Sequence, residues 1–501
     1  MRVAMWADLG RPLSSAEMEV VEANAGALGV SVDALMERAG RAIAEEAIHH
    51  LPGPRARVAI LVGSGNNGGD GACAAHYLLE WGYRPELWLV RPPSQIYAHA
   101  ARRCFERVAA RLPVHLGVPT AEELAAFPLV LDALLGTGQT GPLRSPYSET
   151  VAAIAASRVP TLAVDLPTGV RDPAGLVPTW TVTLTAPKAE MDATRAGEVV
   201  VRDIGIPAAA WAETGPGEFL FFPATSLTAE GRRGRVVVIG GGPYAGAPAL
   251  AALAALRSGA ERATVLAPGG AAEQVQSFNP NLVVRPFGTG AFAAPDVEPI
   301  LHFLDSAPPE AIVLGMGAGA DPATLGALGR LETALAGRYP LVVDADALRT
   351  LPSSVRGGPH AAPLIATPNV GEFLRDFEGT KDSPPEKTRH HVAAVAQRFG
   401  LTLVRKGDPD VISDGVSTFE NRHHSPFQTV AGAGDVLGGV LGALLAQGLP
   451  ATHAARLATY WVGEAGIRVA GSRGAGLVAT DLIEELPGTL VAGLGRVRHP
   501  E

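Results

Sequence analysis

A glycine-rich turn runs directly into a long apolar segment at Val430-Ala431-Gly432-Ala433-Gly434-Asp435-Val436-Leu437-Gly438-Gly439. Glycines at positions 432 and 434 allow backbone N–H groups to crowd together, and a helix that begins there adds its positive dipole end. We therefore predict that this turn binds a phosphate or a developing oxyanion. Asp435 stands among these donors, where it is either a catalytic base or an ordinary cap of the helix.

The sequence around this turn repeats one pattern, in which a short apolar strand ends in glycine or acidic residues. Residues 401–404 lead into Arg405-Lys406-Gly407-Asp408, Arg235–Ile239 lead into a glycine-rich segment, and residues 311–319 and 341–348 follow the same plan. Alternation of such strands with helical segments predicts a central, mainly parallel sheet with helices on both faces. The sequence contains no GxxxxGK[ST], which excludes a P-loop kinase.

Composition narrows the class of protein. The chain has 501 residues, 47% of them apolar and 18% charged, so we expect two globular domains. The formal net charge of −9 removes the electrostatic basis for binding nucleic acid or a membrane, and small molecules are the expected partners. Cys73 and Cys104 are too few for a disulfide framework or a thiolate zinc site, and we expect a reducing, cytoplasmic location. We expect neither secretion nor membrane insertion, because no long apolar segment occurs.

The strongest pattern of the N-terminal half follows two predicted helices, at residues 14–24 and 32–50. Arg57–Val62 form an apolar strand that ends in GSGNNGGDG at residues 63–71, before another helix. The spacing GxGxxG is typical of a dinucleotide-binding turn, but the next strand ends at Arg91 instead of an acidic residue, and Asp70 would repel a phosphate. A polar ligand site with a cation is the favoured interpretation, and a solvated tight turn is the alternative.

Two further strands end in the same way. The apolar strand at residues 129–135, which contains Asp132, leads into a glycine turn at 136–142, and Thr161–Val164 lead into Asp165-Leu166-Pro167-Thr168-Gly169. The carboxyl ends of parallel strands meet at the edge of a sheet where ligands bind. Oxygen-rich Asn67, Asp132 and Thr168 would together suit a hard cation better than zinc. For Asp132 alone, hydrogen bonding to backbone amides is the alternative.

These motifs carry a specific resemblance. GSGNNGGDG, DALLGTGQTG and VDLPTGV resemble, in this order, the signatures of the YjeF N-terminal domain, the NAD(P)H-hydrate epimerase family, over roughly residues 10–210. The resemblance implies a potassium site at Asn67, Asp132 and Thr168. The family usually has Ser at the position of Thr168. The resemblance also places Lys188 near the active site. Asp165 is the candidate for the acid/base step. The implied substrate-binding residues are Asn66, Asn67, Gly68, Gly69, Asp70, Gly136, Thr137, Gly138, Gln139, Thr140, Gly141, Pro142 and Asp165.

The C-terminal half carries a second resemblance. GGPYAGAPALAALAALRSGA, GMGAGA, VVDADAL, TPNVGEF, RKGDPD and AGAGDVLGGVLGALLAQG look like the ribokinase-like YjeF C-terminal domain, the ADP-dependent NAD(P)H-hydrate dehydratase family, over roughly residues 225–490. Asn369, Ala433 and Asp410 stand where the family has His, Thr and commonly Thr. The resemblance implies that Asp435 is the base. It implies a hydrate site at Ala247, Gly317, Gly319, Asn369 and Asp435, and nucleotide binding by Lys406, Gly407, Asp408, Pro409, Asp410 and Gly434.

We therefore predict two doubly wound α/β/α domains, a Rossmann-like one at residues 1–215 and a ribokinase-like one at 225–501. The resemblance implies a bifunctional repair enzyme that interconverts the R and S epimers of hydrated NAD(P)H and dehydrates the S form at the expense of ADP, giving AMP and phosphate. It also implies K⁺ in the first domain and Mg²⁺ in the second, and we expect a homo-oligomer. The alternatives are a ribokinase-like small-molecule kinase, and a first domain that only senses nucleotides or binds a partner.

Overall fold

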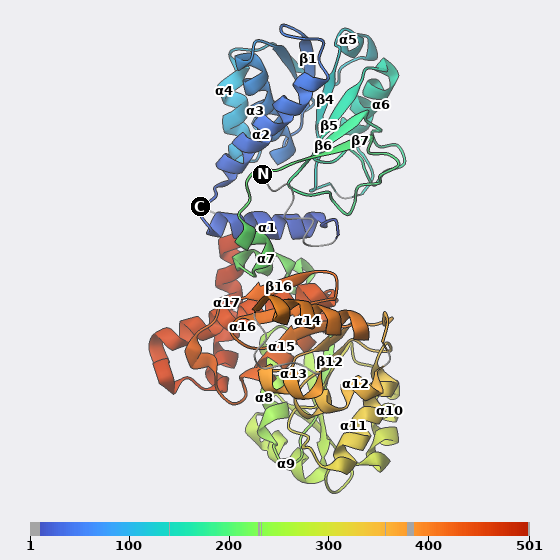
Figure 1. Ribbon diagram of the computed structural model, residues 1–501, viewed down its shortest axis with the longest axis vertical. Coiled ribbons are helices and arrows are strands. Elements are labelled where there is room, and N and C mark those ends of the chain that lie inside the picture. The colour runs from blue at the N-terminus through green and yellow to red at the C-terminus, as the bar shows by residue number, and fades with distance from the viewer. Residues whose placement is uncertain are drawn as a thin grey trace. The chain divides into compact units, whose positions relative to one another are not determined.

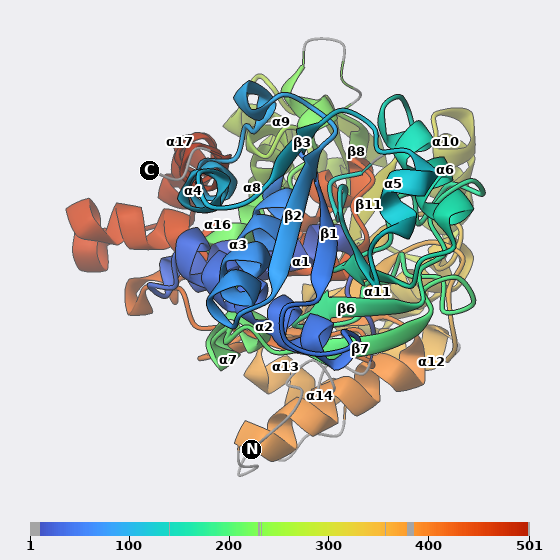
Figure 2. The same cartoon turned by 90° about the horizontal axis from the view of Figure 1, so that it is seen from above.

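The computed structural model describes residues 11–139, 141–228, 231, 233–355, 357–377 and 385–498. The chain divides into two compact units, Met1–Ala210 and Trp211–Glu501, and each has its own sheet (Figures 1 and 2). Both sheets are mainly parallel and are covered by helices, which confirms the predicted α/β class. The predicted ranges, 1–215 and 225–501, concern where the chain can be cut, and they stay a prediction.

Unit 1 contains a seven-stranded sheet in the order β3-β2-β1-β4-β5-β6-β7, in which every pairing is parallel. Strand β1 is buried at every position after its first residue, as expected for a strand covered on both faces. The elements are α1 (Ser15–Ala27), α2 (Val32–His49), β1 (Arg57–Val62), α3 (Asn66–Glu80), β2 (Arg84–Leu89), α4 (His99–Ala109), β3 (Val114–Leu116), α5 (Ala121–Ala125), β4 (Val130–Ala133), α6 (Tyr147–Ser157), β5 (Thr161–Val164), β6 (Trp180–Leu184), β7 (Glu198–Arg202) and α7 (Ala208–Ala212).

The helices of unit 1 lie on both faces of its sheet. Helices α2, α3 and α4 gather on one side and α5 and α6 on the other (Figure 2). Residues of α5 and α6 form a core cluster with alternate residues of β1, including Ala59 and Leu61. Helix α3 contacts β1, β2, β4 and β5. This arrangement places the loops that leave the carboxyl ends of β1, β4 and β5 along one edge of the sheet.

Unit 2 contains a nine-stranded sheet in the order β10-β9-β8-β11-β12-β13-β14-β15-β16. Its first seven strands are parallel, whereas β15 and β16 are antiparallel and were not predicted. The strands are β8 (Arg235–Ile239), β9 (Arg262–Pro268), β10 (Val283–Phe287), β11 (Ala311–Leu314), β12 (Leu341–Val343), β13 (Leu364–Ala366), β14 (Thr402–Arg405), β15 (Asp410–Ser413) and β16 (Thr418–Asn421).

The helices of unit 2 also form two layers. One core cluster joins the sheet to α10, α11, α13 and α14, while α15 contacts β8, β11 and β12 and packs against α8, α16 and α17. The helices are α8 (Gly246–Arg257), α9 (Gly269–Phe278), α10 (Val297–Ser306), α11 (Pro322–Leu335), α12 (Leu351–Ser354), α13 (Val370–Asp376), α14 (Pro385–Phe399), α15 (Ala433–Ala446), α16 (Ala451–Arg473) and α17 (Ala479–Arg498).

Glycines inside α15 explain how closely this helix approaches its neighbours. A β-carbon at Gly439 would lie 2.0 Å from the Ala251 carbonyl oxygen of α8, and one at Gly442 would lie 2.5 Å from Val313 of β11. Glycine within a helix costs about 1 kcal/mol relative to alanine. Close packing of α15 on both α8 and the sheet offsets that cost and fixes the start of the helix over the strand ends.

The segment that follows the division between the units packs into unit 2. Glu218 lies in a short 3₁₀ helix (Pro216–Phe221), and its Oε1 accepts a hydrogen bond from Arg456 of α16 at 2.8 Å. Both side chains are completely buried, and Phe219 beside them is buried too. Residues 216–224, which lie between the two predicted domains, therefore belong partly to the second unit, because an ion pair and an aromatic side chain attach them to its core.

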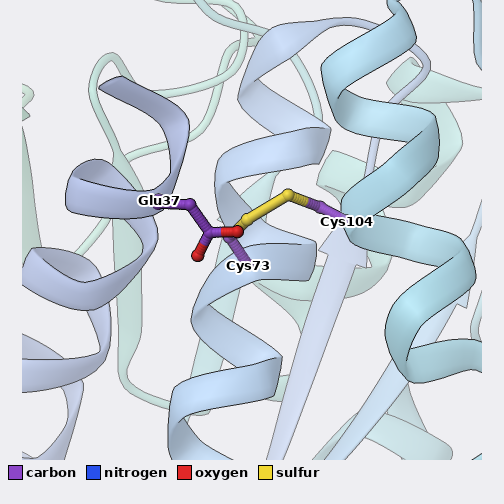
Figure 3. A group of neighbouring side chains, drawn as sticks. All are labelled: Glu37, Cys73 and Cys104. Carbon is purple, nitrogen blue, oxygen red and sulfur yellow. A yellow bond between two sulfur atoms is a disulfide. The ribbon is translucent and has the colours of Figure 1, made fainter. Parts of the chain in front are cut away.

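Cys73 of α3 and Cys104 of α4 form a disulfide, contrary to the expectation of two reduced cysteines (Figure 3). Their Cα atoms are 5.3 Å apart because α3 and α4 pack closely, and a β-carbon at Gly69 would lie 2.7 Å from Ala101 of α4. Glu37 of α2 also lies beside the two sulfur atoms, and such a group could hold a metal. In this structure the sulfur atoms are bonded to each other and Glu37 pairs with Arg107 at 2.6 Å, so we assign no metal there.

None of the helices in the described part of the chain combines the length and the apolar character needed to cross a membrane.

Candidate active sites

The first predicted site lies where β1 ends and α3 begins. Helix α3 starts at Asn66, so the residues predicted as a loop, from Asn66 to Asp70, instead form the first turns of this helix. Gly68 is required here, since a β-carbon would lie 2.1 Å from the Gly63 carbonyl oxygen. The side chain of Asn67 lies beside Gly136, whose β-carbon would be 3.3 Å from it. The structure thus brings the first two predicted motifs together.

The glycine turn after β4 connects to the loop after β5. The side-chain oxygen of Gln139 accepts a hydrogen bond from the Gly169 N–H at 2.8 Å, which ties the second motif to the third. Thr137 is half-buried, whereas Gly138, Gly141 and Pro142 are exposed, as a loop that meets a ligand from solvent would be. Thr140, also predicted here, lies outside the described residues.

Asp132 and Thr168, two of the predicted potassium ligands, are in direct contact. Asp132 is fully buried; its carboxylate accepts hydrogen bonds from the Thr168 hydroxyl at 2.7 Å and from the N–H groups of Thr168 and Leu134 at 2.9 and 3.2 Å. Burial raises the pKa of Asp132 to about 6, against these hydrogen bonds, which act to lower it. Asp132 is therefore also hydrogen-bonded to backbone amides, which was the alternative interpretation of this residue. The side-chain nitrogen of Asn67 is buried without a hydrogen-bond partner.

This donor set fits potassium. The hydrogen-bond partners of Asp132 are a hydroxyl and backbone amides, so no cationic side chain neutralises it through these bonds. A buried carboxylate needs such a charge, and K⁺ accepts the amide, carboxylate and hydroxyl oxygens that Asn67, Asp132 and Thr168 provide. Asp132 and Thr168 are in direct contact, whereas Asn67 lies beside Gly136 in the turn that follows β4.

Asp165 follows β5 in a strained conformation with φ of 63°, which is uncommon for a residue other than glycine. Its Oδ1 accepts hydrogen bonds from the Lys188 ammonium and from the Leu184 N–H at 3.1 Å. The Lys188 side chain is 1% exposed, and its ammonium also donates to the Leu184 carbonyl at 2.7 Å. Lys188 is therefore a buried partner of Asp165.

More carboxyl groups surround this pair than sequence reasoning anticipated. Burial raises the pKa of Asp70 well above its usual range, and Asp165 and Glu22 add to this effect while Lys188 opposes it. Glu22 of α1 is exposed to solvent, yet its pKa is also raised, through desolvation and the charges of Asp165 and Glu19 against Lys188. Glu22 was missed because α1 reaches the site only through tertiary pairing, in which Leu13 forms a parallel bridge with Lys188.

The second site lies at the start of α15. Gly432 caps the helix with a positive φ of 92°, and Gly434 occupies its first turn. A β-carbon at Gly434 would lie 3.0 Å from the Lys406 ammonium nitrogen and 3.6 Å from Asp344 Oδ2. Position 434 is thus glycine because charged side chains from the ends of β12 and β14 approach the helix there. Ala433, which departs from the family pattern, leaves this start of the helix intact.

The groups around Asp435 shift its pKa. Burial, with smaller contributions from the charges of Asp344 and Glu372, raises the pKa of Asp435 to about 7, and Lys406 acts to lower it. The Lys406 ammonium donates to Asp344 Oδ1 at 2.8 Å. Burial acts to lower the pKa of Lys406, but the carboxylates of Asp344 and Glu372 outweigh it, so the ammonium stays charged. Asp435 is the third residue of α15, and the N-cap of this helix is Gly432, which makes no side-chain hydrogen bond.

The remaining residues of the predicted hydrate site surround glycine turns. A β-carbon at Gly317 would lie 3.1 Å from that of Ala247, so these two meet as predicted. The Gly319 N–H donates to Asp346 Oδ2 at 2.8 Å. Asn369 is the N-cap of α13, where its side-chain oxygen accepts from the Glu372 N–H at 2.9 Å, and its backbone forms a bridge with Lys406. Its side-chain oxygen is therefore engaged within the protein.

The predicted nucleotide segment forms the turn between β14 and β15. Asp410 accepts hydrogen bonds from the Gly407 N–H at 2.8 Å and from the Asn421 side chain at 3.0 Å, so it holds the turn together. The side chain of Asp408 is 82% exposed, and Pro409 follows it through a cis peptide bond. Asp410 thus has a structural partner for each oxygen, which explains how an acidic residue is tolerated where the family commonly has Thr.

Two parallel α/β sheets, each with glycine turns and acidic or basic side chains at the carboxyl ends of its strands, define a two-unit α/β enzyme. The sequence profile of the NAD(P)H-hydrate dehydratase family matches residues 236–488, and that of the YjeF-related protein N-terminus matches residues 32–190. The chain belongs to the family of bifunctional NAD(P)H-hydrate repair enzymes, which combine epimerase and dehydratase functions. The small-molecule kinase and the purely sensing first domain are therefore not favoured.

Two members of this family match the chain over nearly its whole length. The bifunctional NAD(P)H-hydrate repair enzyme of Hyperthermus butylicus is 36% identical, over 96% of this chain and 93% of that protein. That of Methanothermobacter thermautotrophicus is 35% identical, over 95% of each. Among solved structures, the ADP/ATP-dependent NAD(P)H-hydrate dehydratase from Bacillus subtilis, co-crystallised with ATP/Mg²⁺, aligns with a TM-score of 0.45 at 22% identity, over 53% of this chain and 92% of that chain.

Proposed function

We propose that unit 2 dehydrates the S form of hydrated NAD(P)H with ADP, and that Asp435 is its base. The observation that carries this assignment is the half-buried Asp435 carboxylate beside the Lys406 ammonium at the start of α15. Asp435 accepts the proton of the hydrate hydroxyl as its oxygen attacks the terminal phosphorus of ADP and AMP leaves. The C–O bond then breaks and phosphate leaves with its electron pair, and loss of a ring proton restores the nicotinamide double bond. The α15 amides and Lys406 stabilise the phosphoryl charge.

The nucleotide requires a cation of its own. Asp344, Glu372 and Asp435 supply three carboxylates against the one ammonium of Lys406, so the surroundings of Asp435 are net negative. A polyphosphate enters such a site with Mg²⁺ on its phosphates, which is the role we propose for this ion. ADP is the proposed phosphoryl donor, and comparing ADP with ATP at equal Mg²⁺ tests it.

For unit 1, we propose that it epimerises the R and S hydrates with Asp165 as the acid/base group. Its support is the strained, Lys188-paired Asp165, which interacts electrostatically with Asp70, and the hydrogen bond from Gly169 to Gln139, which joins the loop after β5 to the glycine turn. Potassium would be held by Asn67, Asp132 and Thr168, where it would balance the buried carboxylate.

One experiment tests both assignments. Purified protein receives mixed R and S hydrates, with and without ADP, and chromatography follows each epimer. We expect interconversion of the epimers without ADP, and loss of the S form with release of AMP and phosphate when ADP is present. Loss of the S form without any AMP would contradict the phosphoryl route.

Partners and location are proposals as well. We propose small-molecule substrates only, supported by the net charge of −9. The predicted cytoplasmic location rested on the two cysteines, and their disulfide counts against a reducing compartment, so cell fractionation is the test. The homo-oligomer stays a prediction that analytical ultracentrifugation can check.

A further inference from the structure

Asp344 occupies a position in unit 2 that none of the assigned roles uses. It follows β12, is 2% exposed, and its own N–H is bonded to the Leu314 carbonyl at 3.1 Å, so its backbone is fixed by the sheet. Oδ1 accepts from the Lys406 ammonium at 2.8 Å. Oδ2 points toward the first turn of α15, 3.6 Å from where a β-carbon at Gly434 would lie. The two oxygens thus face two different functional groups.

We propose that Asp344 is a positioning residue of the dehydratase site. It holds the Lys406 ammonium against the first turn of α15 and thereby fixes the position of this positive charge relative to Asp435. This inference rests on the proposed function of unit 2. A lysine side chain has four flexible carbon–carbon bonds, and its ammonium is a point charge whose place depends on its partners. Because Asp344 is rigid and buried, it determines where that charge lies.

Three charged groups act on Asp435, each from a different element. Asp344 at the end of β12 and Glu372 of α13 raise the pKa of Asp435 beyond the effect of burial, and Lys406 at the end of β14 lowers it. Removal of Asp344 and removal of Lys406 should therefore shift the pKa of Asp435 in opposite directions. If Asp344 had a purely structural role, its removal would lower activity without shifting the pKa of Asp435 in the direction opposite to the removal of Lys406.

The test compares Asp344→Asn with Lys406→Gln. The base form of Asp435 is the deprotonated one, so dehydration of the S hydrate at saturating ADP should rise with pH through about 7 in the wild type. Asp344→Asn should move this rise to lower pH by about one unit, a tenfold change in proton affinity, and Lys406→Gln should move it to higher pH. Glu332→Gln, which changes a buried carboxyl group of α11 that is bonded to Thr350, is the matched control and should leave the profile in place.

A second measurement separates this proposal from the proposed function. Carboxyl carbon shifts of ¹³C-labelled aspartate report the titration of Asp435 in nucleotide-free protein, with Asp435→Asn to identify the signal. Opposite displacements of that titration in the two variants would support the role of Asp344 even if the hydrates were not turned over. An Asp435 titration that stays unchanged in Asp344→Asn, in folded protein, would overturn the proposal.

Discussion

Lys188 and Asp165 form a buried ion pair in unit 1, and this pair fixes a strained residue at the end of β5. The ammonium donates to Asp165 Oδ1, to the Leu184 carbonyl at 2.7 Å and to the Thr183 hydroxyl at 3.3 Å, so each of its three N–H groups has an acceptor. Lys188 is therefore saturated inside the protein, and Asp165 keeps its Oδ2 for other contacts. An acid/base carboxylate held by one oxygen leaves the other for the substrate.

We predict that Lys188→Met lowers the rate of epimerisation by about 10²-fold, because the methionine fills the space but leaves Asp165 free to rotate and without its counter-charge. The rate of interconversion of the R and S hydrates without ADP measures this. Dehydration of the S form belongs to unit 2 and should keep its wild-type rate, which serves as the control. Epimerisation at the wild-type rate in folded Lys188→Met would exclude a role for the pair.

The second prediction concerns the potassium site. Asp132→Asn keeps the shape of the side chain but removes the charge that would bind the ion, so potassium should no longer stimulate epimerisation. In the wild type, K⁺ should support activity and Na⁺ should replace it poorly, because the smaller ion requires a tighter set of oxygen ligands. Titration of epimerisation with each salt at constant ionic strength measures both. A wild-type enzyme that is equally active without either ion would contradict the site.

Much of the fold follows from local sequence. The bounds of β1, β5 and β8 were predicted because each is an apolar run with a sharp break into glycine or aspartate at its end. Strands β15 and β16 were missed, since their polar residues at Asp410 and Asn421 bond to each other only after the strands meet. The Cys73–Cys104 disulfide was missed for the same reason, because the packing of α3 on α4 is not visible in either sequence segment.

The candidate sites show the same limit. Motifs at strand ends could be placed at one edge of a sheet from topology alone, and Asp132 does meet Thr168. The contacts of Lys188 with Asp165 and of Lys406 with Asp344 span 23 and 62 residues, and no local pattern encodes them. Charge pairs between distant strand ends therefore had to be seen in the structure.

A third prediction revises where the chain can be divided. A fragment that begins at residue 225 loses Glu218 and leaves the buried Arg456 without this carboxylate, which costs about 3–5 kcal/mol. A fragment that begins at Trp211 keeps the pair. We expect the longer fragment to melt about 10 °C higher, as measured by calorimetry. Glu218→Gln in the longer fragment should reproduce part of the loss. Equal melting temperatures for the two fragments would show that residues 211–224 do not contribute to unit 2.

The disulfide supplies a fourth prediction. Closing a loop of 31 residues between Cys73 and Cys104 should stabilise unit 1 by about 2–4 kcal/mol. Cys104→Ser should therefore lower the free energy of unfolding of unit 1, and unit 2 is an internal control because the chain has only these two cysteines. Alkylation and mass spectrometry of protein unfolded without reductant report the bond directly. Full alkylation of both cysteines would contradict it.

The fifth prediction is that Asp435→Asn abolishes most dehydration while it stabilises unit 2 at alkaline pH. General-base catalysis contributes about 10²–10⁴-fold, so the rate should fall within that range. Burial, with the charges of Asp344 and Glu372, raises the folded-state pKa of Asp435 from the ordinary value of 3.8 to about 7, so its contribution to stability is complete below about pH 4 and is lost as the pH rises through about 7. Asparagine has no charge to bury and avoids that loss.

Denaturant unfolding at pH 5 and pH 8 tests this pairing of lost activity with gained stability. The variant should gain more over the wild type at pH 8 than at pH 5, and it should still bind ADP, because Lys406 and the Gly434 amide are unchanged and one negative charge near the phosphates has gone. Epimerisation should persist. If Asp435 were only a helix cap, its replacement would instead lose about 1 kcal/mol of stability and leave dehydration near the wild-type rate.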